Sequence, residues 1–189
     1  MSDIQRTTSE TSVALSLELT PGEGTIETSC GFLNHMLTLL AHHAGWGLRL
    51  SASGDLAVDA HHLTEDLGIA LGQALLQELR SGPPRRRYGG CLLPMDGTLV
   101  LAAVDLSGRG LLAWDGTFPS PRCGDFDTEL VPEFWRAFAR ESRSTLHLRA
   151  LAVDNAHHLA EAVFKGAGRA LREALIPGET APSTKGVWL

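Results

Sequence analysis

Hydrophobic and polar positions alternate over some segments of this chain and recur with a longer period over others. Residues 13–19 alternate strictly, which predicts a strand with one buried face. Residues 25–30 and 48–52 are expected to form two further strands, and residues 56–59 a short extended segment. In residues 32–43 and 61–80 apolar side chains recur at the helical spacing, so two amphipathic helices are predicted there.

The second half of the chain repeats this order of periods. Strands are predicted over residues 87–94, 99–106, 111–114 and 146–149, and helices over residues 130–143 and 157–175. Gly and Pro interrupt the pattern between these segments, as expected for turns. Each half is therefore predicted to contain strands, a helix, a further strand and a final helix.

The two halves also match residue by residue. A shift of 96 residues places His61 on His157 and Gly72 on Gly168. Self-similarity on this scale indicates an internal duplication. The predicted fold class is α+β. The first repeat half covers residues 1–84, and the second covers residues 85–189 with a polar tail, both packed in one compact chain.

The clearest mark of the duplication is the motif His-His-Leu-x-Glu, at residues 61–65 and again at 157–161. Residues i and i+4 of a helix share a face, so the first histidine and the glutamate of each copy can bind one metal ion. The second histidine points about 100° away and must serve another purpose. One isolated His-His pair would more often be polar surface, but two copies at matched positions favour two metal sites. Imidazole and carboxylate without thiolate suit Mn, Fe, Ni or Zn.

Composition and charge exclude several classes of protein. The hydrophobic content of 43% and charged content of 20% predict a folded globular chain. The formal net charge of -6 argues against nucleic acid as a partner. The first twelve residues lack the apolar core of a signal peptide, and no segment approaches the ~20 apolar residues of a membrane span. The three scattered cysteines are interpreted as reduced thiols, which predicts a cytoplasmic location.

Several basic and hydroxyl side chains are candidates for binding a phosphate group. They are Arg87, Arg109, Lys165 and the tail residues Ser183, Thr184 and Lys185. Arginine, lysine and hydroxyl groups are what a phosphate monoester needs, although each residue alone could be a solvated surface group. No glycine-rich P-loop accompanies them.

Seven motifs, taken together and in order, are characteristic of one enzyme family. They are Arg-x-Thr-x-Glu-Thr (6–11), Phe-Leu-x-His-Met-Leu (32–37), Gly-Asp-Leu-x-Val-Asp-x-His-His-x-x-Glu-Asp (54–66), Asp-Leu-Ser-Gly-Arg (105–109), Phe-Asp-Thr-Glu-Leu (126–130), Asn-x-His-His-x-x-Glu-x-x-Phe-Lys (155–165) and Pro-Ser-Thr-Lys-Gly (182–186). From Arg6 to about Val187 the sequence resembles imidazoleglycerol-phosphate dehydratase, an enzyme of histidine biosynthesis. The resemblance implies two similar halves, each a four-stranded sheet with two helices, of the ribosomal protein S5 domain 2-like type.

The resemblance also implies two Mn²⁺ ions per active site, lying between subunits. By position, one ion would be bound by His35, His62, His157 and Glu161. The other would be bound by His61, Glu65, Glu133 and His158. This assignment sends the two neighbouring histidines of each motif to different ions. It further implies a homo-oligomer, a particle of about 24 subunits built from trimers.

The implied reaction converts D-erythro-imidazoleglycerol phosphate to imidazole acetol phosphate and water. It would proceed through a dimanganese-bound imidazolate and a diazafulvene intermediate. Glu10 is the first candidate for moving the proton, and the catalytic set also contains the ligands Glu65 and Glu161. The implied substrate-binding residues are Glu10, His35, His43, His61, His62, Glu65, Arg87, Arg109, His157, His158, Lys165, Ser183, Thr184 and Lys185.

Five positions depart from the family pattern. They are Asn34, Gly47, Leu63, Gly97 and Glu133. Asn34 stands where Asp is usual and is expected to weaken a hydrogen bond that orients an imidazole, whereas Glu133 stands where many members have His. Two other functions stay open from the residues alone: a binuclear metal-dependent hydrolase, and a metal-binding assembly protein without catalysis.

Overall fold

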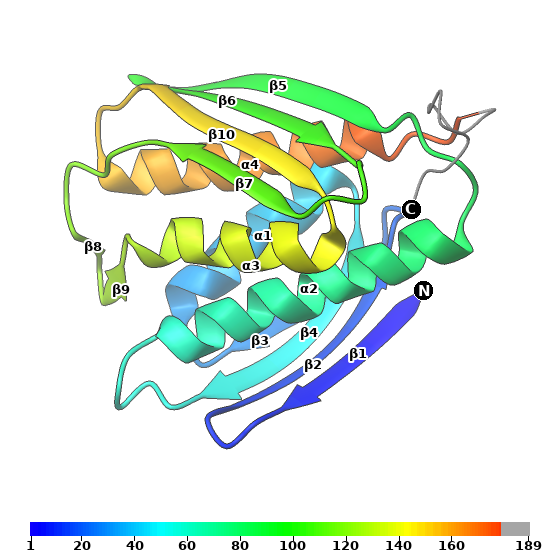
Figure 1. Ribbon diagram of the computed structural model, residues 1–189. Helices are drawn as coiled ribbons and strands as arrows, with labels where there is room; N and C mark the ends of the chain where they lie inside the picture. Colours follow the sequence, from blue (N-terminus) through cyan, green and yellow to red (C-terminus); the bar gives the residue numbers. More distant parts are fainter. Residues whose placement is uncertain (179–189) are drawn as a thin grey trace.

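The computed structural model describes residues 1–178, in which two four-stranded sheets lie on either side of a layer of helices (Figure 1). The first sheet has the order β1-β2-β4-β3 and is built from Ser2–Thr7, Thr11–Glu18, Gly47–Gly54 and Ile26–Thr28. The second has the order β5-β6-β10-β7 and is built from Tyr88–Met95, Thr98–Asp105, Thr145–Ala152 and Leu111–Asp115.

The two sheets repeat one topology, which confirms the predicted duplication. In each sheet the first two pairings are antiparallel, and the last strand runs parallel to its neighbour: β3 to β4 and β7 to β10. A short hairpin of β8 (Arg122–Cys123) and β9 (Phe126–Asp127) is added in the second half, and the sequence pattern did not predict it.

The four predicted helices are confirmed with small shifts at their ends. They are α1 (Gly31–Ala44), α2 (His61–Ser81), α3 (Leu130–Ser142) and α4 (Ala156–Ala174). Helix α2 packs on α3, and α1 packs on α4, so each pair joins one half to the other. Aromatic side chains fill the layer between them, and the ring centroids of Phe134 and Phe164 are 5.2 Å apart.

Two glycines that the repeat superposes hold equivalent places in these helix pairs. A Cβ atom at Gly72 would lie 2.7 Å from the carbonyl oxygen of Phe138 on α3. A Cβ atom at Gly168 would lie 2.9 Å from the carbonyl oxygen of Leu40 on α1. Both contacts are too short for a real Cβ, so the missing side chain lets the helix backbones approach closely.

At the edges of the first half one strand was not predicted and one prediction was wrong. Residues 2–7 form β1 and pair with β2, although the sequence shows little alternation there and Ile4 is the one large apolar residue of this strand that is buried. The segment expected to be extended after β4 is a turn, closed by a hydrogen bond from the amide of Val58 to the carbonyl of Asp55. Leu56 and Val58 produced a strand-like alternation, yet both are exposed.

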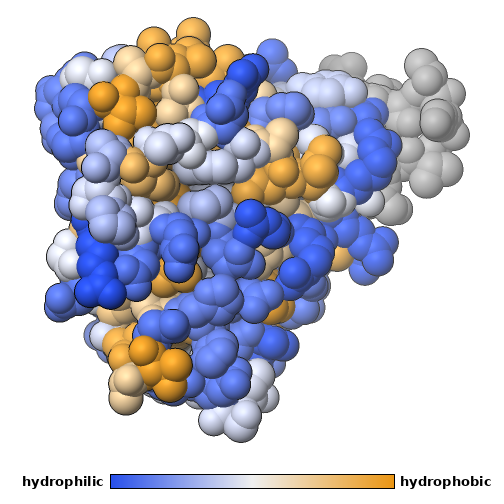
Figure 2. All heavy atoms as spheres, turned by 60° about the vertical axis from the view of Figure 1, so that its left-hand side comes forward, coloured by the Kyte–Doolittle hydropathy of each residue, from blue (hydrophilic) through white to orange (hydrophobic). Residues whose placement is uncertain are grey.

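The outer faces of the two sheets differ in chemistry. The first sheet presents the polar side chains of Asp3, Gln5, Ser16, Arg49 and Ser51. The second exposes Leu92, Leu111 and Leu151, with relative exposures of 61%, 54% and 53%. In Figure 2 apolar side chains gather along the top, on the side of the second sheet. Among the described residues, no helix is long and apolar enough to cross a membrane.

Candidate active site

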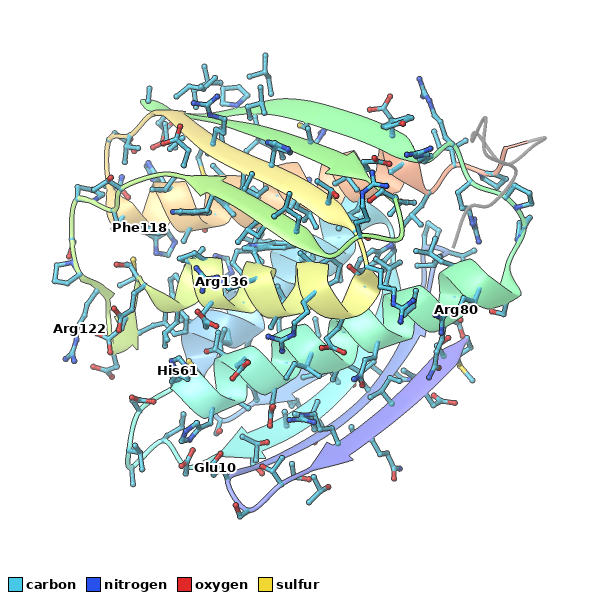
Figure 3. The ribbon with its side chains drawn as sticks, viewed as in Figure 1. Glu10, His61, Arg80, Phe118, Arg122 and Arg136 are labelled. Atoms are coloured by element: carbon cyan, nitrogen blue, oxygen red, sulfur yellow. The ribbon has the colours of Figure 1, made fainter. Side chains whose placement is uncertain are left out.

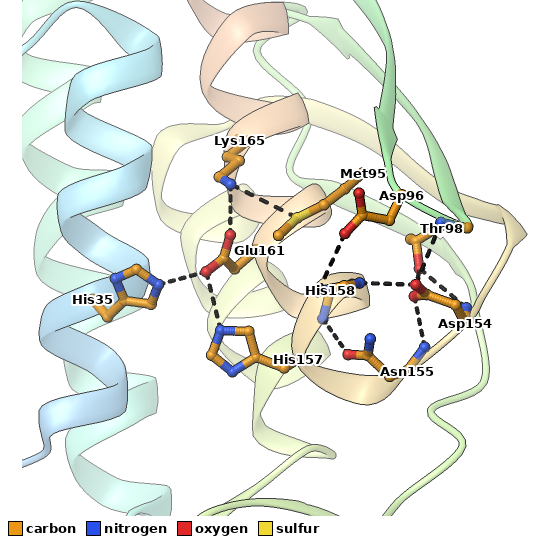
Figure 4. A network of polar contacts seen from close by, with 11 residues as sticks. His35, Met95, Asp96, Thr98, Asp154, Asn155, His157, His158, Glu161 and Lys165 are labelled. Atoms are coloured by element: carbon orange, nitrogen blue, oxygen red, sulfur yellow. Dashed lines mark hydrogen bonds and ion pairs between the residues drawn. The ribbon is translucent and has the colours of Figure 1, made fainter.

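The packing of α1 on α4 brings two histidines to one glutamate. Oε1 of Glu161 lies 2.6 Å from Nε2 of His35 and 3.0 Å from Nε2 of His157 (Figure 4). One ligand atom from each of the three side chains lies within 4.8 Å of the others. Within residues 1–178 this is the one group of three or more such side chains that is close enough to hold a metal ion. Three of the four ligands predicted for the first ion therefore meet in a single chain.

Glu161 is the buried member of this cluster, with a relative exposure of 7%. Its second oxygen, Oε2, accepts a hydrogen bond of 2.5 Å from Nζ of Lys165, one turn further along α4. Burial raises the pKa of Glu161, but the hydrogen bonds from Lys165, His35 and His157 outweigh it and lower the pKa to about 2. The carboxylate is therefore ionised at neutral pH, which is the form that binds a cation.

The ligands predicted for the second ion do not meet in one chain. Oε1 of Glu65 lies 3.4 Å from Nη2 of Arg140, and Glu133 forms an ion pair with Arg136 on its own helix. His61 lies at the start of α2, and its amide donates to Asp59.

The turn between β1 and β2 places Glu10 beside the first histidine pair. Oε2 of Glu10 lies 3.8 Å from Nδ1 of His62. This turn is tied to α2 through the buried Asp66, which accepts hydrogen bonds from Arg6 at 2.8 Å and from the hydroxyl of Thr11. The N-terminal motif therefore has a structural explanation: Arg6 and Thr11 fix the turn that carries Glu10.

Most candidate ligands lie at one end of the molecule. Figure 3 shows Glu10, His61 and Arg122 at the same end, where α2 begins and the β8–β9 hairpin projects. A pocket of about 840 Å³ opens there and is lined by His35 and His157 among others. The ring of Phe32 closes its inner side, stacked on Phe126 with centroids 4.8 Å apart and edge-on to His157.

The arginines predicted to bind phosphate lie together but far from this end. Arg87 binds Asp105 through Nε at 2.7 Å, and Nη2 of Arg109 lies 3.9 Å from the same carboxylate. The amide of Arg87 donates to the carbonyl of Ala174 at the end of α4, whereas His157 begins that helix. At 1.5 Å per residue the two positions are about 25 Å apart, which is too far for one small substrate within one chain.

Three further predictions on substrate binding have different outcomes. Lys165 lies in the cluster through its bond to Glu161. His43 lies on α1 in a separate pocket of about 620 Å³, which Arg169 and Arg172 also line. Burial is the main cause that lowers the pKa of His43, and neighbouring positive charges add to it. Ser183, Thr184 and Lys185 lie outside the described residues.

Asn34, which stands where the family usually has Asp, was expected to weaken a hydrogen bond to an imidazole, but its side chain binds the backbone instead. Its side-chain oxygen accepts from the amide of Thr28 at 2.7 Å, and its side-chain nitrogen donates to the carbonyl of Thr28 at 3.3 Å. Asn34 therefore holds β3 against the start of α1, and the described hydrogen bonds of its side chain go to the backbone rather than to an imidazole. An amide can make both bonds, whereas an ionised carboxylate can only accept.

Sequence reasoning gave no role to four aspartates that hold candidate site residues. They are Asp55, which binds His62; Asp66, which anchors the Glu10 turn; Asp105, which binds Arg87; and Asp154, which binds His158. Three of them stand inside the motifs quoted above, and Asp154 directly precedes another. The motifs indicated that these aspartates matter, but only the structure shows which residues they bind.

Comparison with known proteins identifies the family. A family model described as imidazoleglycerol-phosphate dehydratase matches residues 28–171. The imidazoleglycerol-phosphate dehydratase of Xanthobacter autotrophicus is 51% identical over 189 residues, 97% of this chain and 96% of the relative. That of an Exiguobacterium species is 47% identical over 190 residues, 99% of this chain and 97% of the relative.

The chain belongs to the imidazoleglycerol-phosphate dehydratase family.

Solved structures of imidazoleglycerol-phosphate dehydratases share the fold. The crystal structure of the Staphylococcus aureus enzyme is 41% identical, with a TM-score of 0.87, and the match covers 94% of this chain and 99% of that one. The Pyrococcus furiosus enzyme, in complex with (S)-C348, is 40% identical, with a TM-score of 0.88, covering 97% and 99%. As a member of this family the chain is an enzyme, a hydro-lyase of histidine biosynthesis.

Proposed function

We propose that this enzyme dehydrates D-erythro-imidazoleglycerol phosphate to imidazole acetol phosphate, using two Mn²⁺ ions per active site. The observation that supports this most directly is the cluster of His35, His157 and Glu161 in a chain of the dehydratase family. The donors are two imidazoles and one buried, ionised carboxylate, a set without thiolate that fits Mn²⁺.

The first ion would be held by this cluster together with His62, and the second by His61, Glu65, Glu133 and His158. In one chain His62 lies beside Glu10 instead of the cluster, so the proposal requires His62 to come from another subunit. Bound manganese would stabilise the deprotonated form of the substrate's imidazole ring, as metals lower the pKa of other ligands.

We assign the proton transfer to Glu10. The dehydration would pass through the diazafulvene intermediate, in which the ring electrons have expelled the hydroxyl group of the side chain. A carboxylate must then take the proton from the adjacent carbon. This proton and the expelled hydroxide together make up the released water, and the remaining enol would ketonise to imidazole acetol phosphate. Glu10 is exposed, lies on an anchored turn beside His62 and is not among the proposed metal ligands, which supports this role.

The phosphate group requires residues from more than one subunit. Arg87 and Arg109 lie about 25 Å from the start of α4, so their participation needs a second copy of the chain. The exposed leucines of the second sheet offer an apolar surface for association, in contrast to the polar first sheet. We therefore propose a homo-oligomer, a particle of about 24 subunits built from trimers.

The test is an assay of metal-stripped and Mn²⁺-loaded enzyme with imidazoleglycerol phosphate. We expect imidazole acetol phosphate to form only after loading with Mn²⁺. Release of inorganic phosphate instead would indicate a hydrolase. If two ions bind and no reaction follows, the chain is a metal-binding assembly protein without catalysis. Particle size by light scattering before and after chelation would check whether the ions join subunits. The cytoplasmic location stays a prediction that fits the three free cysteines.

A further inference from the structure

The second histidine of each His-His pair has its Nδ1 atom bound by an aspartate. Nδ1 of His62 lies 3.0 Å from Oδ2 of Asp55, in the turn after β4. Nδ1 of His158 lies 2.9 Å from Oδ2 of Asp154, in the segment between β10 and α4 (Figure 4). His157, the first histidine of its pair, instead directs Nε2 to Glu161.

The two aspartates are not copies of each other. The shift that superposes the two His-His pairs places Asp55 on Leu151 and Asp154 on Val58. Asp55 stands seven residues before its histidine, and Asp154 four residues before its own. The two halves therefore form the same hydrogen bond with aspartates at different positions. A bond inherited with the repeat would use equivalent positions.

The bond determines which nitrogen of the ring can bind a metal. A neutral imidazole has one N–H donor and one nitrogen with a free lone pair. A carboxylate at Nδ1 retains the proton there, so the lone pair is on Nε2. Among the described residues, the Nε2 atoms of His62 and His158 accept no hydrogen bond. Nε2 of His158 lies 3.7 Å from a carboxylate oxygen of Asp96, beyond hydrogen-bond distance.

Asp154 is itself held firmly in place. Its carboxylate accepts hydrogen bonds from the hydroxyl of Thr98 at 2.5 Å and from the amides of Asn155 and Gly97. A Cβ atom at Gly97 would lie 2.9 Å from Cβ of Asp154. Gly97, one of the departures from the family pattern, therefore leaves room for the aspartate to approach the loop.

We propose that Asp55 and Asp154 are positioning residues that orient His62 and His158, each through Nδ1, so that Nε2 faces a metal ion. This inference rests on the proposed function, because it assigns His62 and His158 to different ions. It goes beyond the ligands themselves: Asp55 serves the ion bound by His35, His157 and Glu161, and Asp154 serves the other ion.

The test is calorimetric titration of the metal-stripped full-length protein with Mn²⁺ alone. The wild type is expected to bind two ions per chain. Loss of a partner that orients a metal-bound histidine typically weakens the metal by about 10- to 100-fold, so Asp55→Asn should weaken one of the two ions by this factor. Asp154→Asn should weaken the other one. Asp3→Asn is the matched control, because Asp3 bonds Ser16 on the outer face of the first sheet.

A double-mutant comparison connects each aspartate to its ion. In a Glu161→Gln background the first site is already disabled, so adding Asp55→Asn should change Mn²⁺ binding by less than about 2-fold, whereas adding Asp154→Asn should weaken it further. Thr98→Val is a second variant, which retains the Asp154 carboxylate but removes its hydroxyl anchor. It should weaken only the ion that Asp154→Asn weakens, and circular dichroism verifies the fold of each variant.

The outcomes separate this inference from the function on which it rests. If the wild type binds two ions and both aspartate variants bind them with wild-type affinity, the positioning role is overturned and the dehydratase proposal stands. If both variants weaken both ions equally, the aspartates support the structure in general and the positioning role is again overturned. If the wild type binds no Mn²⁺, both proposals fail.

Discussion

The two copies of the His-His-Leu-x-Glu motif have the same sequence pattern and opposite surroundings. In the second copy Glu161 is buried and bonded to His35 of the neighbouring helix. Upstream of the motif the two halves match at a shift of 98 residues, which places His35 on Glu133, so the equivalent neighbour of Glu65 is another carboxylate. Each of these two carboxylates pairs with an arginine of α3 instead.

This difference shows that the motif alone does not form a ligand cluster. A histidine and a glutamate attract each other across a helix pair, whereas two glutamates repel. The second copy is therefore assembled within one chain, whereas the carboxylates of the first copy pair with arginines, and the proposed second ion would bring them together. Four predictions test this comparison.

The largest effect is expected at Glu10, which lies beside the first copy. Glu10→Gln removes the proposed proton carrier but no proposed metal ligand. Positioned general acids and bases typically contribute about 10²- to 10⁴-fold, so kcat should fall by this factor while Mn²⁺ binding is retained. Steady-state kinetics with a parallel metal titration provide the measurement. Unchanged kcat would exclude Glu10 from the proton transfer.

The next effect concerns the buried carboxylate of the second copy. In metal-free protein, Glu161→Gln should lower the free energy of unfolding at pH 7 on the order of 3 kcal/mol, because the folded state lowers the pKa of Glu161 from its ordinary value of 4.5 to about 2. Because the pKa is lower in the folded state, the ionised carboxylate of Glu161 stabilises the fold fully above pH 4.5. This contribution is lost as the pH falls toward 2 and the carboxylate is protonated. Urea unfolding of both proteins between pH 7 and 3 should therefore show a shrinking difference.

Glu65→Gln is the matched control for this pH series. Glu65 occupies the same motif position, but its ion pair with Arg140 is partly exposed, and such pairs contribute less than about 1 kcal/mol. A loss at Glu65 as large as that at Glu161 would mean that the two copies do not differ in the metal-free protein.

A moderate effect, equal in the two halves, is expected at the helix-pair glycines. Gly72→Ala and Gly168→Ala would each push a methyl group against a carbonyl oxygen of the facing helix. Overpacking of this kind should cost about 1–2 kcal/mol of unfolding free energy at each site. Thermal unfolding would measure both. If only one variant is destabilised, the helix pairs are less equivalent than their backbones suggest.

The smallest effect is expected from making the first copy resemble the second. Glu133→His places an imidazole where the repeat has His35 and removes one of two neighbouring carboxylates. Removal of one of the two carboxylates that pair with arginines of α3 should reduce like-charge repulsion and stabilise metal-free protein by about 0.5–1 kcal/mol at neutral pH. Urea unfolding would detect the change. A decrease in stability would show that the ion pair of Glu133 with Arg136 outweighs the repulsion from Glu65.

The amino-acid sequence by itself determined the duplication, the four helices and the identity of the candidate ligands. These features depend on local periodicity and on motifs whose residues lie within one turn of each other, such as His157 and Glu161. The sequence also paired Gly72 with Gly168, although it gave no reason for the match. Strand β1 was missed because its buried positions alternate between polar and apolar residues, with Ile4 the one apolar side chain among them. The β8–β9 hairpin was missed because each of its strands has two residues, too few to show a period.

Only the tertiary structure decided which side chains meet. His35 reaches Glu161 because α1 packs on α4, a contact between residues 126 positions apart in the chain. The same packing placed Arg87 at the far end of α4 from His157, so the two cannot share a substrate in one subunit. The shapes of the segments that lead into α2 and α4 gave His62 and His158 their aspartate partners, seven and four residues away, which the repeat pattern does not relate. Periodicity specifies which face of an element is buried, but the neighbour of that face is set by long-range packing.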